Sequence, residues 1–208
     1  MRGINRRSLI ASAAVALLPP AGARAQEVTE DAYFAGTGDD HGVAFRRTNL
    51  ELIEPEFHRQ VVPYRHSEAA GSIIVDIRNH HLYLAYENNV ALRYGCGVGR
   101  EGFKWFGRAQ IMRKSVWPDW VPPPEMRQRQ PHLPAKMKGG WGNPLGPRAM
   151  YLYRDGRDLL YRIHGTVEPW TIGTDVSSGC IRMLNEDVID LFARAPVGTR
   201  VHVLEFVE

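Results

Sequence analysis

Cysteine is scarce in this chain, which has only two in 208 residues, Cys96 and Cys180. Two thiols cannot build a disulfide scaffold, although in an oxidising compartment they can form one Cys96–Cys180 bridge. They also lack the paired spacing of a zinc site, and the eight histidines are scattered along the chain. The sequence therefore predicts no metal site and no cofactor, and it leaves one disulfide as a structural interpretation of Cys180.

Long apolar runs are missing as well. The run Leu9–Leu18 is too short for a membrane span, which takes about 20 residues. A basic head precedes this run and small residues follow it, which is typical of a secretory signal; a buried N-terminal core helix is the alternative. We expect residues 1–25 to be removed on export, leaving no integral membrane segment. The adjacent Arg6 and Arg7 allow the twin-arginine route beside the general secretory (Sec) route.

An excess of one charge is also absent once the signal is set aside. The chain has 26 Lys+Arg and 23 Asp+Glu, a net charge of +3. Residues 1–25 hold four arginines and no acidic residue, so the remainder has 22 basic and 23 acidic side chains, a net charge of −1. The sequence therefore predicts no nucleic-acid partner, because such a partner needs a basic surface.

The rest of the chain is long enough for one domain with its own core. Residues 26–70 are interrupted by glycines and show no sustained periodicity, which predicts a partly ordered leader. The last part of this leader, residues 53–65, has apolar and aromatic residues that can dock on the domain. Strand signals begin at Ser72, so the domain itself is expected over residues 71–208.

Short runs rich in β-branched and aromatic residues predict a mainly β fold. The expected strands are 72–77, 82–87, 90–99, 109–117, 149–153, 159–165 and a last alternating run at 199–206. Turn residues separate several of them, such as Asn88-Asn89 and Asp155-Gly156. One helix is expected over residues 185–195, with Asn185 as its N-cap, and a shorter one within residues 123–130, where proline can begin a helix.

A proline-rich stretch from Pro118 to Arg148 interrupts this β pattern. A loop of this length is unusual in a compact domain unless it covers a site. Trp117, Trp120 and Trp141 lie in or beside it and predict a lid or a wall of a cleft. The alternative is that these indoles only pack on the sheet, as buried aromatic side chains commonly do.

The chemistry of the sequence lies in "YRIHGTVEPWTIGTDVSSGCIRM", residues 161–183. A cysteine attacks as its thiolate, and a neighbouring histidine can accept the thiol proton to form a thiolate–imidazolium pair. Gly179 lets backbone N–H groups turn toward a developing oxyanion. Cys180 has polar neighbours on both sides, which favours an exposed and ionisable thiol. His164 and Cys180 are therefore the candidate base and nucleophile.

"IHGT" followed by "SSGCIRM" resembles the signature of the L,D-transpeptidase (YkuD-type) catalytic domain. The resemblance extends over about residues 72–205 and implies a β-sandwich-like domain that acts on the stem peptides of peptidoglycan. In that family's pattern Cys180 is the nucleophile and His164 the general base. The carbonyl of Gly165 orients the imidazole, and the backbone at Gly179 and Cys180 forms the oxyanion hole.

The same resemblance implies how substrate is held. Arg182 is expected either to brace the loop or to meet a substrate carboxylate, and Ser178, Trp141 and Thr166 are expected to contact substrate. Many family members have His or Asn where this chain has Ser178, so no second histidine tunes the thiol. Ser177 is expected to be structural.

The implied reaction begins with attack of Cys180 on the carbonyl before the terminal D-Ala of a tetrapeptide stem. The thioester then passes to an amine of a second stem, giving a 3→3 cross-link, or to an envelope protein; attack by water makes the enzyme a carboxypeptidase. The implied location is a periplasm, in contact with the cell wall. Two rivals remain: a papain-like peptidase, in which the cysteine usually precedes its histidine, and a wall-binding module without catalysis.

Overall fold

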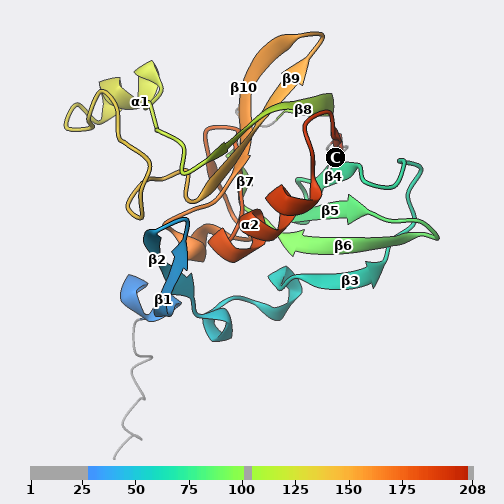
Figure 1. Cartoon of the computed structure of the whole chain (residues 1–208), viewed down its shortest axis with the longest axis horizontal. Helices are drawn as coiled ribbons and strands as arrows, with labels where there is room; N and C mark the ends of the chain where they lie inside the picture. The colour runs from blue at the N-terminus through green and yellow to red at the C-terminus, as the bar shows by residue number, and fades with distance from the viewer. Residues whose placement is uncertain (1–27, 101–104, 206–208) are drawn as a thin grey trace, which may run out of the picture.

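The computed structural model describes residues 28–100 and 105–205, except for the side chain of residue 125. The predicted signal segment therefore lies outside the described residues. The fold is mainly β, as predicted, with two α-helices in the described part (Figure 1). No helix of the described residues is long and apolar enough to cross a membrane.

Thirteen strands are assigned in the described chain. They are β1 (Phe34–Asp40), β2 (Val43–Thr48), β3 (Gln60–Pro63), β4 (Ile73–Asp76), β5 (His81–Ala85), β6 (Val90–Gly95), β7 (Val98–Gly99), β8 (Gly107–Val116), β9 (Arg148–Arg154), β10 (Arg157–His164), β11 (Asp175–Ser177), β12 (Ile181–Arg182) and β13 (Arg200–Val203). The helices are α1 (Pro124–Arg129) and α2 (Asn185–Arg194), with short 3-10 helices η1 (Glu30–Tyr33), η2 (Leu50–Leu52), η3 (Pro55–Phe57) and η4 (Pro169–Thr171).

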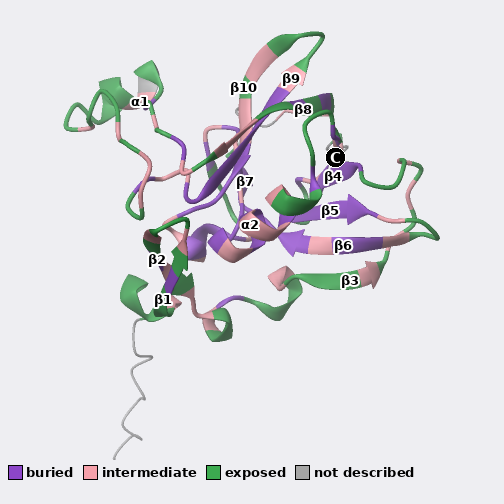
Figure 2. Cartoon of the chain, viewed as in Figure 1, coloured by how far each residue is buried: buried purple, intermediate pink, exposed green. Residues whose placement is uncertain are grey.

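Nine of these strands form one sheet in the order β12-β10-β9-β8-β13-β4-β5-β6-β3. Its neighbours are antiparallel except for two parallel pairs, β10 with β12 and β13 with β4. The strands β8, β9 and β10 run obliquely to β5 and β6 in Figure 1. Buried residues of both halves belong to one hydrophobic cluster, so the sheet encloses a shared core (Figure 2).

Helix α2 closes this core through Val188 and Leu191, both fully buried. These residues are three apart, which places them on one face of a helix. The short helix α1 lies within the predicted range and has proline in its first turn, where the missing N–H costs no hydrogen bond.

The predicted turns are confirmed by backbone geometry. Asn88 and Asn89 have φ of 60° and 55°, the left-handed region that a two-residue hairpin turn between β5 and β6 requires. Asp155 and Gly156, with φ of 50° and 75°, make the same kind of turn between β9 and β10.

The N-terminal part is more ordered than the sequence predicted. Strand signals were expected to begin at Ser72, but β1 and β2 form a hairpin and β3 pairs with β6 at the edge of the main sheet. Strand β3 has four residues and ends in Pro63, which an edge strand tolerates because one side makes no ladder hydrogen bonds. So short a run gives almost no period-2 signal. Residues 53–65, expected to dock on the domain, include this strand.

The predicted N-cap of α2 was wrong by one residue. Leu184 occupies the cap position, and Asn185 is the first helical residue. The Asn185 side chain instead accepts a hydrogen bond from the backbone N–H of Thr166 at 3.0 Å. The side chain of Asn185 therefore bonds a residue 19 positions earlier in the chain, instead of capping its own helix as the sequence suggested.

Candidate active site

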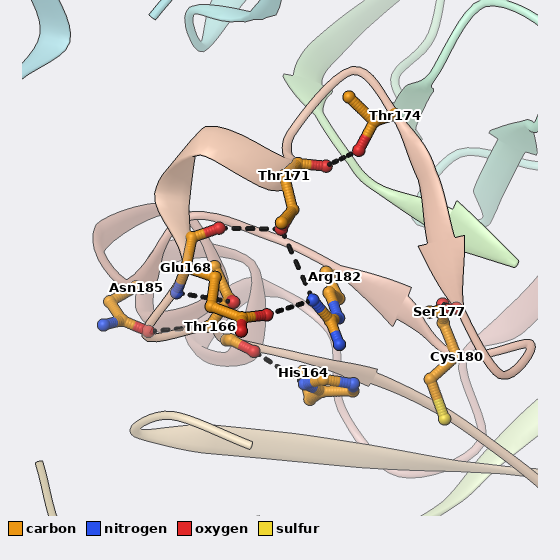
Figure 3. A network of polar contacts seen from close by, with 10 residues as sticks. His164, Thr166, Glu168, Thr171, Thr174, Ser177, Cys180, Arg182 and Asn185 are labelled. Carbon is orange, nitrogen blue, oxygen red and sulfur yellow. Dashed lines mark hydrogen bonds and ion pairs between the residues drawn. The ribbon is translucent and has the colours of Figure 1, made fainter. Parts of the chain in front are cut away.

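Strands β10 and β12 bring His164 and Cys180 together. They pair in parallel with Ile163 opposite Ile181 and His164 opposite Arg182, so Cys180 lies beside Arg162. Side chains alternate between the faces of a sheet, and Ile163 and Ile181 both point into the core. Arg162, His164, Cys180 and Arg182 therefore share the other face. Figure 3 shows His164 and Cys180 on adjacent segments of this face.

The hydrogen bond of His164 fixes which ring nitrogen can act as a base. His164 is buried, and its Nδ1 lies 2.6 Å from the carbonyl oxygen of Gly165. A carbonyl only accepts, so Nδ1 carries the proton and Nε2 of the neutral ring has a free lone pair. Burial and the nearby Arg182 guanidinium lower the pKa of His164 to about 3, which keeps the ring neutral.

Cys180 as a residue is partly exposed, in contrast to the fully buried Cys96. Burial of the thiol raises the pKa of Cys180, while the backbone N–H of Arg162 and the Arg162 and Arg182 guanidinium groups act in the opposite direction. The raised thiol pKa and the lowered imidazole pKa both favour the neutral forms of the two groups. Burial thus opposes the thiolate–imidazolium pair expected from the sequence, because neither charge is well solvated, and that pair stays a prediction.

The loop before Cys180 is held by Ser177. Its buried Oγ accepts the Gly179 backbone N–H at 3.1 Å and donates to the Cys180 carbonyl at 2.5 Å. Gly179 has φ of 103°, which a residue with a Cβ adopts only with strain. This agrees with a structural Ser177. It also means that the Gly179 N–H is occupied in this conformation, although the sequence suggested it as an oxyanion donor.

A network of polar side chains lies next to His164, on the side away from Cys180 (Figure 3). Arg182 Nη1 donates to Glu168 Oε2 at 2.6 Å and reaches Thr171 Oγ1 at 3.5 Å. Arg182 thus already binds a carboxylate of the protein itself, which favours the loop-bracing role over contact with a substrate carboxylate. Thr166 is buried, with its N–H bonded to Asn185 and its Oγ1 accepting the Glu168 N–H, so it braces the loop and is not open to a ligand.

A cavity of about 770 Å³ opens beside Cys180. Ser178 and Cys180 line it on one side, and the proline-rich loop lines the other with Trp120, Pro122 and Met126 among its residues. The loop is therefore a wall of the cleft, as predicted. The remaining lining comes from β8, β9 and β10.

The other two tryptophans of the prediction lie elsewhere. Trp117 packs against Phe45 and donates its indole N–H to the Asp40 carbonyl at 3.0 Å. Trp141 is 67% exposed and lines a separate cavity with Trp170, so the structure does not bring it to Cys180. Of the expected substrate contacts, Ser178 alone lines the cavity at the thiol.

Among the lining residues that the sequence analysis gave no role are Arg113, Tyr151 and Arg162. They come from three different strands, and although Arg162 lies in the stretch 161–183, no motif marks it as part of a site. The strand register was needed to bring them together.

Both cysteines are free thiols, so the disulfide alternative is wrong. Cys96 belongs to the core cluster, and burial raises the pKa of its thiol well above the ordinary range. It is the packed structural thiol that the sequence suggested. Among the described residues no group of three or more His, Cys, Asp or Glu side chains is arranged to hold a metal ion.

Comparison with known proteins points to one family. The family profile of the L,D-transpeptidase catalytic domain (YkuD) matches residues 70–203. The probable L,D-transpeptidase ErfK/SrfK of Escherichia coli K12 is 36% identical over 142 residues, which are 64% of this chain and 44% of that protein. The chain therefore spans less than half the length of this curated relative.

Solved structures show the same fold. The avibactam carbamoyl enzyme of Ldtfm superimposes with a TM-score of 0.51 at 19% identity, over 67% of this chain and 51% of that one. A crystal structure from Brucella melitensis, described as a probable carnitine operon oxidoreductase, has a TM-score of 0.50 at 44% identity, over 77% of this chain and 98% of that one.

The described residues give the oxidoreductase description no support. Gly97, Gly99 and Gly102 have the GxGxxG spacing, which in dinucleotide-binding proteins joins a parallel strand to a helix. Here the next described element after β7 is β8, a strand that begins at Gly107 and pairs antiparallel with β9 and β13. A Cβ on Gly97 would lie 2.5 Å from the Thr171 carbonyl oxygen, so this glycine allows close packing against η4.

Proposed function

This chain belongs to the L,D-transpeptidase catalytic-domain family, and on that premise we propose that it is an active L,D-transpeptidase using Cys180 as its nucleophile. One observation carries the proposal. Cys180 lines the 770 Å³ cavity and shares a sheet face with His164, whose Nδ1–H is held by the Gly165 carbonyl. A binding module needs neither a thiol at the cavity wall nor an oriented base beside it.

The first half of the proposed reaction forms a thioester. The Cys180 sulfur attacks the carbonyl that joins the third stem residue, typically diaminopimelate, to the terminal D-Ala. His164 Nε2 takes the thiol proton as the C–S bond forms, which suits a pair that is neutral at rest. The tetrahedral intermediate collapses, the C–N bond breaks, and imidazolium returns the proton to the departing D-Ala amine.

The developing oxyanion needs backbone donors near Cys180. The Cys180 N–H is our first candidate. The Gly179 N–H becomes a second donor when it exchanges Ser177 Oγ for the oxyanion. Gly179 thus keeps the role suggested by the sequence in the reacting complex.

The second half transfers the acyl group to an amine. Neutral His164 removes a proton from the incoming amine, which attacks the thioester and releases the Cys180 thiol. An amine on a second stem gives a 3→3 cross-link, and an amine on an envelope protein gives a wall-bound protein. Water as the acceptor gives L,D-carboxypeptidase activity.

The proposal extends to location. We propose export to a periplasm through the signal at residues 1–25, leaving mature residues 26–208 with the leader at 26–70 before the catalytic region. The basic head and short apolar run of the signal support export. Peptidoglycan stems are the proposed partners, with an envelope protein as the other acceptor.

The test is incubation of residues 26–208 with a purified disaccharide-tetrapeptide under reducing conditions, followed by mass spectrometry. We expect D-Ala release and cross-linked dimers that lack one D-Ala. Cys180→Ala should abolish both products, and His164→Gln should reduce them by about a thousandfold or more. Release of D-Ala without dimers would mean that water is the acceptor, or that the amine acceptor is missing from the mixture. Release of D-Ala by Cys180→Ala would overturn the proposal.

A further inference from the structure

A row of side chains crosses the floor of the cavity toward Cys180. Tyr151 on β9 is in register with Arg113 on β8 and with Arg162 on β10. The guanidinium carbon of Arg113 lies 3.5 Å from the centroid of the Tyr151 ring, and that of Arg162 lies 4.5 Å from it. Since Cys180 lies beside Arg162 in the next segment, the row runs from Arg113 to the nucleophile.

Two irregularities in the sheet produce this alignment. The pairing of β8 with β9 shifts register between Ile111 and Arg113, and the pairing of β9 with β10 shifts between Asp158 and Arg162. In the second shift Leu160 has φ of 61°, an unusual conformation for a branched residue. Bulges of this kind re-aim side chains and are frequent beside active sites. Both lie next to the row, at the cavity.

Of the two arginines, Arg162 has a carboxylate counterion among the described residues and Arg113 does not. Arg162 donates two hydrogen bonds to Asp158, at 2.9 and 3.1 Å, so its charge is neutralised within the protein. Arg113 is exposed, and no carboxylate of the described residues lies within ion-pair distance of it. The acidic residue that lines the same cavity, Asp119, is paired with Lys136 at 2.6 Å. Within the described part of the cavity, the positive charge of Arg113 therefore has no balancing carboxylate.

Stacking on Tyr151 holds the Arg113 guanidinium in an orientation that suits a planar anion. The Arg113 guanidinium lies over the Tyr151 ring, and Arg113 lines the cavity. A guanidinium stacked by its face keeps the N–H groups of its edge available to a ligand. A guanidinium edge matches a carboxylate with two parallel hydrogen bonds. The aromatic contact limits the rotamers of Arg113 and so reduces the entropy lost when the anion binds.

We propose that Arg113 binds a carboxylate of the donor peptide upstream of the scissile bond, so that the enzyme selects stems whose internal carboxylates are free over stems in which they are amidated. This rests on the proposed function. The Arg113 guanidinium lies over Tyr151 of β9, two strand spacings, or about 10 Å, from the segment of Cys180. An extended peptide covers that length in about three residues, and the stem has three residues upstream of the scissile bond. The terminal D-Ala carboxylate, one residue from the scissile carbonyl on the other side of that bond, is too close to be the group that binds Arg113.

The experiment measures occupancy of the site, by bound stem or by thioester, as protection of the Cys180 thiol. The rate at which iodoacetamide alkylates Cys180 is measured at increasing concentrations of a tetrapeptide stem. The stem is used in two forms, one with its internal carboxylates free and one with them amidated. For the unmodified chain we expect the free-acid stem to bind about five- to tenfold more tightly, and the ratio to fall between 0.05 M and 0.5 M salt. Arg113→Gln should lower the ratio to about one by weakening the free-acid stem alone.

Two further variants make the result specific. Arg113→Lys keeps the charge but loses the paired hydrogen bonds and the stacking, so it should restore part of the preference. Arg127→Gln changes an exposed arginine of α1 that does not line the cavity, and it should leave the ratio unchanged. The unprotected alkylation rate should be the same in all four proteins.

Each other outcome counts against the inference. Equal protection by both stems in the unmodified chain, or equal weakening of both stems by Arg113→Gln, would show that Arg113 does not read a carboxylate. D-Ala release is measured separately on the same samples. Selective protection without D-Ala release would overturn the proposed reaction and leave the binding role of Arg113 standing.

Discussion

Asp40 and Arg148 form a bidentate ion pair, with Arg148 Nη1 and Nη2 donating to the two carboxylate oxygens at 2.7 and 2.8 Å. Asp40 ends strand β1, and Arg148 begins β9 directly after the proline-rich loop. The Asp40 carbonyl also accepts the indole N–H of Trp117, the residue before this loop. The Trp117 backbone N–H in turn bonds to the Pro147 carbonyl at 2.8 Å. One residue of the N-terminal hairpin thus contacts both ends of the loop that walls the cavity.

Asp40→Asn tests this attachment. Both partners are largely buried, and loss of the carboxylate charge leaves the Arg148 guanidinium without its counterion. We expect a loss of about 3 kcal/mol in the free energy of unfolding at pH 7, measured by urea titration. Trypsin should also cleave within residues 118–147 faster than in the unmodified chain. Asp39→Asn, on the same hairpin but exposed, is the control and should change neither property.

The pH dependence of the same pair follows from its pKa. Hydrogen bonding to Arg148 lowers the pKa of Asp40 below that of an unfolded carboxyl group. The pair therefore stabilises the protein fully above the unfolded value of about 4 and is lost as pH falls through the lowered pKa. The difference between Asp40→Asn and the unmodified chain should shrink as pH falls below about 4. A constant difference down to pH 2 would contradict this origin.

Ser177→Ala tests the loop geometry around the nucleophile. Ser177 Oγ is the link between the Gly179 N–H and the Cys180 carbonyl, so its removal should let the loop relax away from the reactive conformation. We expect D-Ala release to fall about tenfold or more in kcat, with KM little changed. Ser178→Ala is the matched control: Ser178 lines the cavity, so its loss should act mainly on KM. Equal effects of the two variants on kcat would argue against a positioning role for Ser177.

The sequence predicted the β character and the turns because these depend on local signals. Asn88-Asn89 and the run before His164 each determine the conformation of a few residues. The His-Gly and Gly-Cys motifs likewise named His164 and Cys180 as candidates, and their assignment as base and nucleophile stays a prediction. None of these signals depends on tertiary contacts, so all of them can be read in a single sequence.

The features that escaped prediction depend on long-range pairing. Strand β3 was missed because four residues at a sheet edge have almost no periodicity. Asn185 was predicted to cap its own helix, whereas its side chain accepts a hydrogen bond from the Thr166 backbone N–H. The row from Arg113 through Tyr151 exists only once β8 and β9 pair with a register shift. Trp141 was assigned to the cleft by its place in the loop, but the loop path carries it to another cavity.

Alkylation of Cys180 should follow the pH profile of an unassisted thiol. Burial raises the pKa of Cys180 above its ordinary value of 9.0, and burial lowers that of His164 to about 3, so no ion pair supplies thiolate at neutral pH. The rate of reaction with iodoacetamide should therefore be low at pH 6 to 8 and rise toward and beyond pH 9. His164→Gln should leave this profile nearly unchanged. A plateau of high reactivity between pH 5 and 8, abolished by His164→Gln, would instead establish a thiolate–imidazolium pair.

Asp187 on α2 should make the protein less stable at alkaline pH. It is buried, its Oδ2 has no hydrogen-bond partner in the described structure, and its Oδ1 lies 3.7 Å from Arg59 Nε. Burial raises the pKa of Asp187 to about 7, above its unfolded value of 3.8. The unfolded carboxyl ionises above about 3.8 whereas the folded group stays protonated up to about 7, so the free energy of unfolding falls as pH rises from about 4 to 7 and keeps its lower value above pH 7.

Asp187→Asn should therefore raise the free energy of unfolding by about 1–2 kcal/mol at pH 8.5, with little change or a loss below about pH 4, where the carboxyl is protonated in both states. Asp190→Asn is the contrasting control on the same helix: Asp190 accepts hydrogen bonds from Tyr94 and Arg194, so its loss should destabilise the protein at pH 8.5. Destabilisation of similar size by both variants at pH 8.5 would show that Arg59 compensates the Asp187 charge despite the 3.7 Å separation.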